Sequence, residues 1–214
     1  EPTIPRFMAR ILIVANGGWP KAFKIVKNIA EYDAVIALDG AANRMIEANI
    51  VPTAIIGDLD SVDDATLEHC KTNGTMVIHT PNQDQSDVSK GLAWATKTYP
   101  NAHIDLIGIE IGRYDHHLAA YSALFETESS ARILMDGWSA LRVSSTPNHI
   151  QVREGAIVSL MPFGEVTGVS LQGCEYPLSH ASITTGTQGV SNRAIDSTIV
   201  VSAQSGDLLL LIEG

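Results

Sequence analysis

The sequence has few of the features that membrane, secreted and nucleic-acid-binding proteins depend on. No apolar run is long enough to cross a bilayer and no secretory-signal pattern opens the chain, so we expect a cytoplasmic protein with no membrane partner. The two cysteines, Cys70 and Cys174, lie far apart and form no CxxC pair, which fits a reduced protein without disulfides or a zinc site. Only 14 Lys and Arg stand against 24 Asp and Glu, so we expect no nucleic-acid partner.

Common nucleotide-binding and hydrolase motifs are also absent. The sequence contains no GxxxxGK[ST] loop, GxGxxG fingerprint, protein-kinase motif set, HExxH motif or GxSxG elbow. Because the net charge is −10, an anionic phosphate substrate would need a metal ion or a few well-placed cations in order to bind. A phosphate site in this chain would therefore use carboxylates and metal where a P-loop uses backbone amides and a lysine.

The first two thirds of the chain alternate short apolar runs with helical patterns. Strands are expected at 11–15, 34–38, 52–57, 76–79, 103–109 and 132–135, and helices at 22–31, 41–49, 62–73, 86–99 and 116–126. Continuous apolar strands separated by helices predict an α/β fold, a doubly wound and mainly parallel sheet that is covered on both faces.

The pattern changes after about Gly137. From there the chain has short alternating strands, many Ser, Thr and Gly residues and no convincing helix. This texture predicts a smaller antiparallel β-sandwich or barrel, and we favour the sandwich. We therefore expect an α/β nucleotide-binding domain at 1–138 and a β domain at 139–214.

Two carboxylates follow the third predicted strand, in Ile55-Ile56-Gly57-Asp58-Leu59-Asp60-Ser61. In an extended chain alternate side chains point the same way, so Asp58 and Asp60 would lie side by side. Their repulsion favours a hard divalent cation such as Mg²⁺ between them. The alternative is a solvated turn in which either residue caps the next helix.

A second polar cluster, residues 82–90, follows the fourth predicted strand and opens a helix. Asp84, Asp87 and Lys90 are spaced three residues apart and can share a helix face. The free amides at a helix start favour anions, and Lys90 adds a cation. The alternative is an ordinary acidic helix start that is capped by Ser86 or Asp84.

A third polar cluster, Gly112 to His117, lies between the fifth predicted strand and its helix. Arg113 can fork onto a phosphate, and Asp115 could hold Arg113, face the metal or cap the helix. His116 and His117 occupy adjacent helical positions that face different ways, which favours one packed and one exposed histidine over a metal site.

Small residues follow the first two strands. Asn16-Gly17-Gly18 and Asp39-Gly40-Ala41-Ala42-Asn43 would let a ligand approach the backbone closely, or they are simply tight strand-to-helix turns. In a parallel sheet, ligands bind outside the carboxyl ends of the strands. All five of these segments fall at such ends, so we expect one shared site.

Taken in order, the motifs resemble those of the thiamine pyrophosphokinase family. The matching blocks are Asp39 to Asn43, Pro52 with Ile56 to Ser61, Gln83 to Lys90, Gly112 to His116, Gly173 to Leu178, and Gly189 to Asn192. Each block is weak alone, but the ordered set is specific and spans nearly the whole chain. The sequence departs from the family pattern at Ala41 and Ile111, where glycines are usual, and at Arg193, where an acidic residue is common.

The resemblance implies a homodimeric enzyme that transfers the diphosphoryl group of ATP to thiamine and releases AMP. It implies Mg²⁺ on Asp58, Asp60 and Asp87, phosphate charge stabilised by Lys90 and Arg113, and thiamine contacts from Ser191 and Asn192. The full catalytic set is expected to be Asp58, Asp60, Asp84, Asp87, Lys90, Arg113 and Asp115. Ligand contacts are expected from Asn16, Asp39, Gly40, Asn43, Gln83, Ser191 and Asn192. Two alternatives remain open, a Mg²⁺-dependent nucleotide phosphohydrolase and a non-catalytic thiamine or nucleotide sensor.

Overall fold

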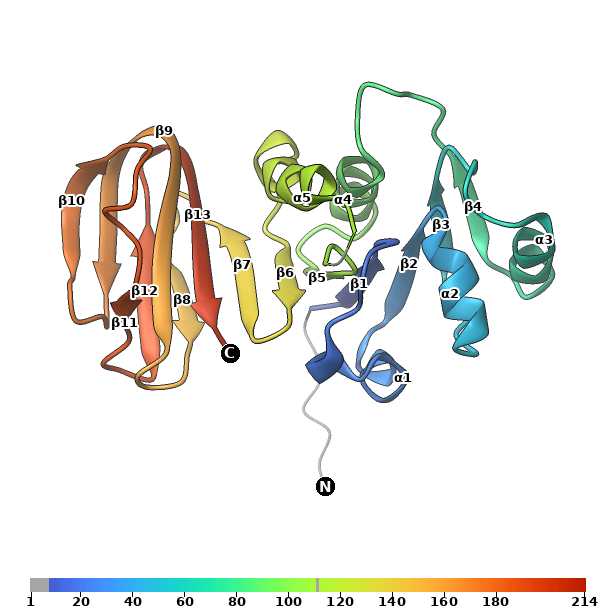
Figure 1. The fold of residues 1–214 in the computed structure, drawn as a ribbon, viewed down its shortest axis with the longest axis horizontal. Coiled ribbons are helices and arrows are strands. Elements are labelled where there is room, and N and C mark those ends of the chain that lie inside the picture. Colours follow the sequence, from blue (N-terminus) through green and yellow to red (C-terminus); the bar gives the residue numbers. More distant parts are fainter. Residues whose placement is uncertain (1–7, 111) are drawn as a thin grey trace. The chain divides into compact units, whose positions relative to one another are not determined.

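The computed structural model describes residues 8–110 and 112–214 (Figure 1). Two sequence observations lie outside these residues. They are the absence of a signal pattern over the first residues and the departure from the family pattern at Ile111. The chain divides into two compact units, residues 1–136 and 137–214, which are described in turn. No helix in the described ranges is long and apolar enough to span a membrane.

The first unit is built on a parallel sheet with the strand order β4-β3-β2-β1-β5-β6. The strands are β1 (Arg10–Val14), β2 (Ala34–Leu38), β3 (Ala54–Gly57), β4 (Met76–His79), β5 (His103–Ile107) and β6 (Arg132–Met135). β1 to β3 and β5 are almost completely buried, as their unbroken apolar runs predict. The predicted α/β fold is confirmed.

Helices connect these strands. They are α1 (Ile25–Asn28), α2 (Ala41–Glu47), α3 (Asp64–Thr72), α4 (Asp87–Thr98) and α5 (Tyr114–Glu126). The single helix expected at 22–31 is wrong, because the segment consists of α1 between two 3₁₀ turns, η1 (Lys21–Phe23) and η2 (Ile29–Glu31). Lys24 has a left-handed φ of 42°, which breaks the helical repeat between η1 and α1.

Helices cover the sheet on both faces. Residues of α1, α2 and α3 pack in one apolar cluster with Leu12, Val35 and Ala37 of the sheet. Since successive strand residues point to opposite faces, Leu38 points away from this cluster. Gly91 of α4 lies against the Leu38 side chain, and α5 packs beside α4 (Figure 1). This arrangement leaves the carboxyl ends of the strands open for a site.

The second unit is entirely antiparallel. Its strands are β7 (Trp138–Arg142), β8 (Asn148–Gln151), β9 (Ile157–Gln172), β10 (Leu178–Ile183), β11 (Asn192–Arg193), β12 (Thr198–Ser202) and β13 (Ser205–Glu213). The long β9 pairs with β11 and β13 mainly through its first half and with β10 and β12 through its second half. It therefore contributes to two sheets, whose apolar side chains form one core. This is the predicted sandwich.

Candidate active site

A pocket of about 510 Å³ lies at the carboxyl ends of the strands in the first unit. Its lining comes from the segments that follow β1, β2, β3, β4 and β5 and from the starts of α4 and α5. Of the predicted site residues, the lining includes Asn16, Asp39, Gly40, Asp58, Gln83, Asp87, Lys90 and Arg113. The pocket therefore lies where the sequence predicts the site, because parallel strands bring all of their carboxyl ends to one edge.

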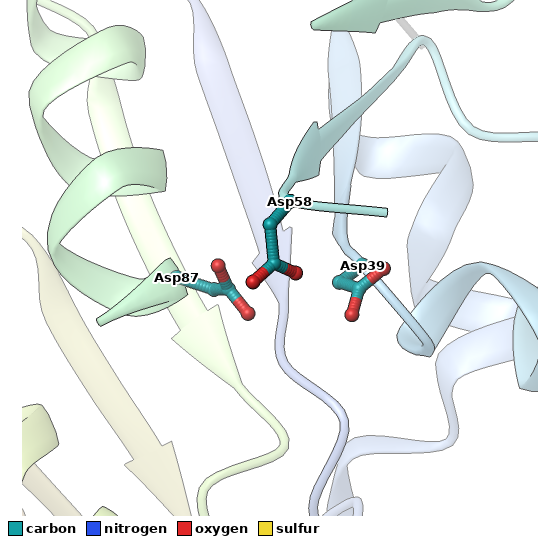
Figure 2. A group of neighbouring side chains, drawn as sticks. All are labelled: Asp39, Asp58 and Asp87. Carbon is teal, nitrogen blue, oxygen red and sulfur yellow. The ribbon is translucent and has the colours of Figure 1, made fainter. Parts of the chain in front are cut away.

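Three carboxylates, Asp39, Asp58 and Asp87, form the only group of potential metal ligands found among the described residues. One oxygen from each side chain lies within 4.8 Å of the others, and Figure 2 shows the three side chains next to one another, with those of Asp58 and Asp87 face to face. Asp39 follows β2, Asp58 follows β3, and Asp87 is the first residue of α4. Three hard oxygen donors at this spacing suit a divalent cation such as Mg²⁺.

The expectation that Asp58 and Asp60 lie side by side is wrong. Leu59 takes a left-handed φ of 64°, so the chain is not extended between them. Asp60 accepts a hydrogen bond of 2.8 Å from Ser61 Oγ and is not part of the group of three. Its place in the group is taken by Asp39, which the sequence suggested only as a nucleotide contact. The capping alternative is also wrong, because the residue before α3 is Asp63.

Asp39 is the buried member of the group, with 4% of its surface exposed. Burial raises its pKa, and the nearby carboxylates of Asp87 and Asp60 raise it further, against hydrogen bonds from Ser61 that lower it. The Ser61 amide donates to Asp39 Oδ2 at 3.2 Å. A carboxylate that is destabilised by burial and by its neighbours would gain from a cation between them.

Asp58 and Asp87 each have a polar partner. Gln83 Nε2 donates a hydrogen bond of 2.9 Å to Asp58 Oδ2, and this bond lowers the pKa of Asp58. Lys90 Nζ lies 3.3 Å from Asp87 Oδ1, and the lysine side chain is only 6% exposed. With all three carboxylates ionised, the ammonium group of Lys90 leaves the cluster net negative and able to accept a cation.

The start of α4 matches the capping alternative in part. Ser86 is the residue before the helix, and its side chain accepts a hydrogen bond from the Ser89 amide. Asp84 is exposed and does not line the pocket, and its amide donates to Asn82 Oδ1. Its predicted place near the reacting phosphates stays a prediction.

Arg113 and Asp115 form a forked ion pair at the start of α5. Arg113 Nε lies 3.1 Å from Asp115 Oδ1, and its terminal nitrogen lies 2.5 Å from Oδ2. The hydrogen bonds from Arg113 lower the pKa of Asp115 to about 2. Such a carboxylate is ionised at neutral pH but is a weak proton acceptor. Of the roles left open for Asp115, the structure shows the one in which it holds Arg113, the residue that lines the pocket.

The two histidines separate as predicted. His116 is exposed and lines the pocket, whereas His117 is partly buried and its Nε2 lies 2.9 Å from the Tyr121 hydroxyl.

Asn43 has a structural role in this loop system. Its Nδ2 donates to the Ser61 carbonyl at 3.0 Å, and its Oδ1 accepts from the Asp63 amide at 3.0 Å. Both polar atoms are thus used to fix the loop after Asp58. Asn43 does not line the pocket, and its predicted ligand contact stays a prediction. Gly40 does line the pocket, and a Cβ there would lie 2.6 Å from Asn16 Nδ2, so a side chain at this position would displace that of Asn16.

Ser191 and Asn192 lie where a loop of the second unit leads into β11. The Asn192 side chain accepts from the Tyr176 and Arg193 amides at 3.1 and 2.8 Å and donates to the Tyr176 carbonyl at 2.7 Å. Ser191 has a left-handed φ of 66°, and its amide donates to Ser159 Oγ at 3.0 Å. Their contact with thiamine stays a prediction.

Sequence reasoning missed two contributors to the site. Ser61 lines the pocket, and its amide donates a hydrogen bond to Asp39. The sequence feature that could have identified it is its place at the end of the Asp58 motif. The carboxylate role of Asp39 was also missed. It is the first residue after the strand that neighbours β3, which is the position that would have identified it.

Two family profiles match the chain. The catalytic domain of thiamin pyrophosphokinase matches residues 26–135, and the vitamin B1 binding domain of thiamin pyrophosphokinase matches residues 144–208. The thiamine pyrophosphokinase of Bacillus subtilis is 27% identical over 219 residues, covering 95% of this chain and 98% of that protein.

Solved structures of thiamin pyrophosphokinases have the same fold. The crystal structure of thiamine pyrophosphokinase from Bacillus subtilis aligns with a TM-score of 0.77 at 25% identity, covering 95% of this chain and 98% of that one. A thiamin pyrophosphokinase family protein from Enterococcus faecalis aligns with a TM-score of 0.80 over 96% and 99% of the two chains, and at 21% identity it supports the fold alone. The resemblance drawn from the ordered motifs is confirmed, and the chain belongs to the thiamin pyrophosphokinase family.

Proposed function

We propose that this enzyme transfers the diphosphoryl group of ATP to thiamine, giving thiamine diphosphate and AMP. The hydroxyethyl oxygen of thiamine bonds to the β-phosphorus of ATP and loses its proton, while the bond from that phosphorus to the α,β-bridging oxygen breaks and AMP leaves. The observation that carries the proposal is the group formed by Asp39, Asp58 and Asp87 in the pocket of a chain that belongs to this family.

The carboxylate group fits a magnesium ion. Asp39, Asp58 and Asp87 would hold it, since Mg²⁺ prefers carboxylate oxygens and shares its other positions with water and phosphate. When bound, the ion would offset the negative charge of the triphosphate. Asp60 lies close enough for its negative charge to help raise the pKa of Asp39. We therefore propose that Asp60 attracts the metal ion at longer range without binding it directly.

The cations of the pocket would meet the phosphates. Lys90 is held by Asp87 at the start of α4, and Arg113 is held by Asp115 at the start of α5. Positive groups fixed in this way can stabilise charge on the transferred group and on the departing AMP without reorganising. Gln83 fixes Asp58, and Asn16 and Gly40 shape the wall against which ATP would lie. We assign no general base, because Asp115 is too weak a proton acceptor and a loose transition state has little need of one.

Thiamine would be bound with the help of the second unit. Ser191 and Asn192 lie at the loop that leads into β11, which is fixed to β9 and to Tyr176, and the profile that matches this unit is that of a vitamin B1 binding domain. Thiamine carries a positive thiazolium ring, which a net acidic protein favours. We further propose a cytoplasmic homodimer in which this loop serves the active site of the partner subunit.

Product analysis tests the proposal. The purified protein is incubated with ATP and Mg²⁺, with and without thiamine, and the products are identified by chromatography and phosphorus NMR. Equal amounts of AMP and thiamine diphosphate that form only when thiamine is present support it. ADP, or AMP with free pyrophosphate, in the absence of thiamine would indicate a phosphohydrolase. Binding of thiamine and ATP without any product would indicate a sensor.

A further inference from the structure

The last residue of α5 is bonded to the start of α4. Glu126 Oε2 accepts a hydrogen bond of 2.5 Å from Ser89 Oγ, and Oε1 accepts one of 3.0 Å from Gln85 Nε2. Ser89 is only 1% exposed, whereas Glu126 is exposed, so the bond between them is partly buried at the surface of the unit. A single carboxylate therefore joins the end of α5 to two residues at the start of α4, which precede it by 37 and 41 residues in the sequence.

The two partners of Glu126 lie on either side of Asp87. Gln85 precedes Asp87 by two residues and lines the pocket, and Ser89 follows Asp87 by two residues. Ser89 is also bonded to Ser86, through its amide at 3.2 Å and between the two hydroxyls at 3.2 Å. The backbone that carries Asp87 is thus held from both sides by one network centred on Glu126.

Glu126 is well suited to hold this network at neutral pH. The hydrogen bonds from Ser89 and then Gln85 lower its pKa, so the side chain is ionised and both oxygens accept. Hydrogen bonds to an ionised acceptor are stronger than those between neutral groups. Glu126 does not line the pocket, so it would act through Asp87 and Lys90 without contact with substrate.

We propose that Glu126 is a positioning residue of the active site. It fixes the first turn of α4 so that the Asp87 carboxylate stays in the metal-binding group and Lys90 stays beside it. This inference rests on the proposed function. Residues that orient metal ligands from outside the coordination shell commonly change metal affinity by about 10- to 100-fold when they are removed.

Two substitutions and a control test the role. Glu126→Ala removes both acceptors. We expect the Mg²⁺ concentration that gives half-maximal activity to rise roughly tenfold, while the KM for thiamine changes less than about twofold. Glu126→Gln should restore most of the loss, because its carbonyl oxygen can accept from Gln85 and its amide can donate to Ser89 Oγ. Glu47→Ala, which removes an exposed carboxylate from α2 of the same unit, is the matched control and should behave as wild type.

Two measurements do not depend on turnover. Calorimetry with Mg²⁺ and a non-hydrolysable ATP analogue should show the same tenfold loss for Glu126→Ala and its recovery in Glu126→Gln. Hydrogen exchange of the metal-free protein should be faster over residues 85–90 in Glu126→Ala alone. If wild type makes no AMP with thiamine, the proposed function fails, whereas exchange and Mg²⁺ binding still decide the role of Glu126. Wild-type Mg²⁺ affinity and exchange in Glu126→Ala, or a lower unfolding temperature with unchanged Mg²⁺ affinity, would overturn the inference.

Discussion

Asp39 and Asp58 follow neighbouring parallel strands, and each places a carboxylate oxygen within 4.8 Å of the other. Asp39 is the more costly of the two to keep ionised, because it is buried beside other carboxylates. A protein that keeps a charge in such a position usually does so for function, at some cost in stability. Comparing substitutions of Asp39 and Asp58 therefore tests the metal site more sharply than substituting either residue alone.

We expect Asp39→Asn to lower kcat/KM by about 100-fold or more, a loss as large as that of Asp58→Asn. The unfolding temperature should not fall, because Asn removes a destabilised charge and tolerates the left-handed φ of 42° at this position. Activity assays over a range of Mg²⁺ concentrations and thermal unfolding check both statements. Asp64→Asn, an exposed carboxylate at the start of α3, is the control. Near wild-type activity in Asp39→Asn would exclude it from the metal site.

The strands and the location of the site could be predicted because they depend on simple patterns. Apolar runs such as 11–15 and 34–38 can be buried on both faces only in a covered parallel sheet, and that sheet collects its carboxyl ends at one edge. The broken segment 21–31 could not be predicted, because Lys24 adopts a left-handed conformation that its residue type does not favour.

The grouping of Asp39, Asp58 and Asp87 could not be predicted either, again because one residue adopts an unexpected left-handed conformation. The alternation rule that joined Asp58 to Asp60 holds only for an extended chain, and Leu59 is left-handed. The hydrogen bonds of Asn43 to Ser61 and Asp63 fix this loop, and they depend on how α2 lies beside it. Glu126 belongs to no motif and was identified only from its contacts with Ser89 and Gln85.

The ion pair between Arg113 and Asp115 leads to a second prediction. Arg113→Ala should lower kcat by about 100-fold, since one fixed cation on the transferred phosphates is lost. Arg113→Lys should recover little of this, because an ammonium group cannot reproduce the fork. Steady-state kinetics with ATP and thiamine measure both variants, and Arg153→Ala in the second unit serves as the control for loss of a paired arginine.

Asp115→Asn separates the positioning role of Asp115 from proton transfer. With a pKa of about 2 in the folded protein, Asp115 is ionised throughout the usual assay range. We expect a loss of less than about tenfold and no change in the acid limb of the pH–rate profile, since Asn can still accept one bond from Arg113. A loss as large as that of Arg113→Ala, with a shifted acid limb, would instead identify Asp115 as the general base.

The buried carboxylate of Asp105, in β5, leads to a prediction about stability. Asp105 has no exposed surface and does not line the pocket, and it accepts from Tyr32 at 2.7 Å and from Arg132 at 3.0 Å. His103 and Arg10 each lie 3.5 Å away. Hydrogen bonds from His103 and the charge of Arg132 outweigh the effect of burial, and the pKa of Asp105 is held well below its ordinary value.

A carboxyl group whose pKa is lower in the folded than in the unfolded chain stabilises the protein above the unfolded value, which is about 3.9. We expect Asp105→Asn to lower the free energy of unfolding by about 3 kcal/mol at pH 7, because Arg10 and Arg132 lose the buried carboxylate that pairs with them. The difference from wild type should be the same at pH 5 and 7 and should narrow as the pH falls below about 4, where wild type begins to lose this contribution. Urea unfolding of both proteins at pH 7, 5 and 3 measures it. Equal stability at pH 7, or a difference that widens at pH 3, would show that Asp105 does not act through its charge.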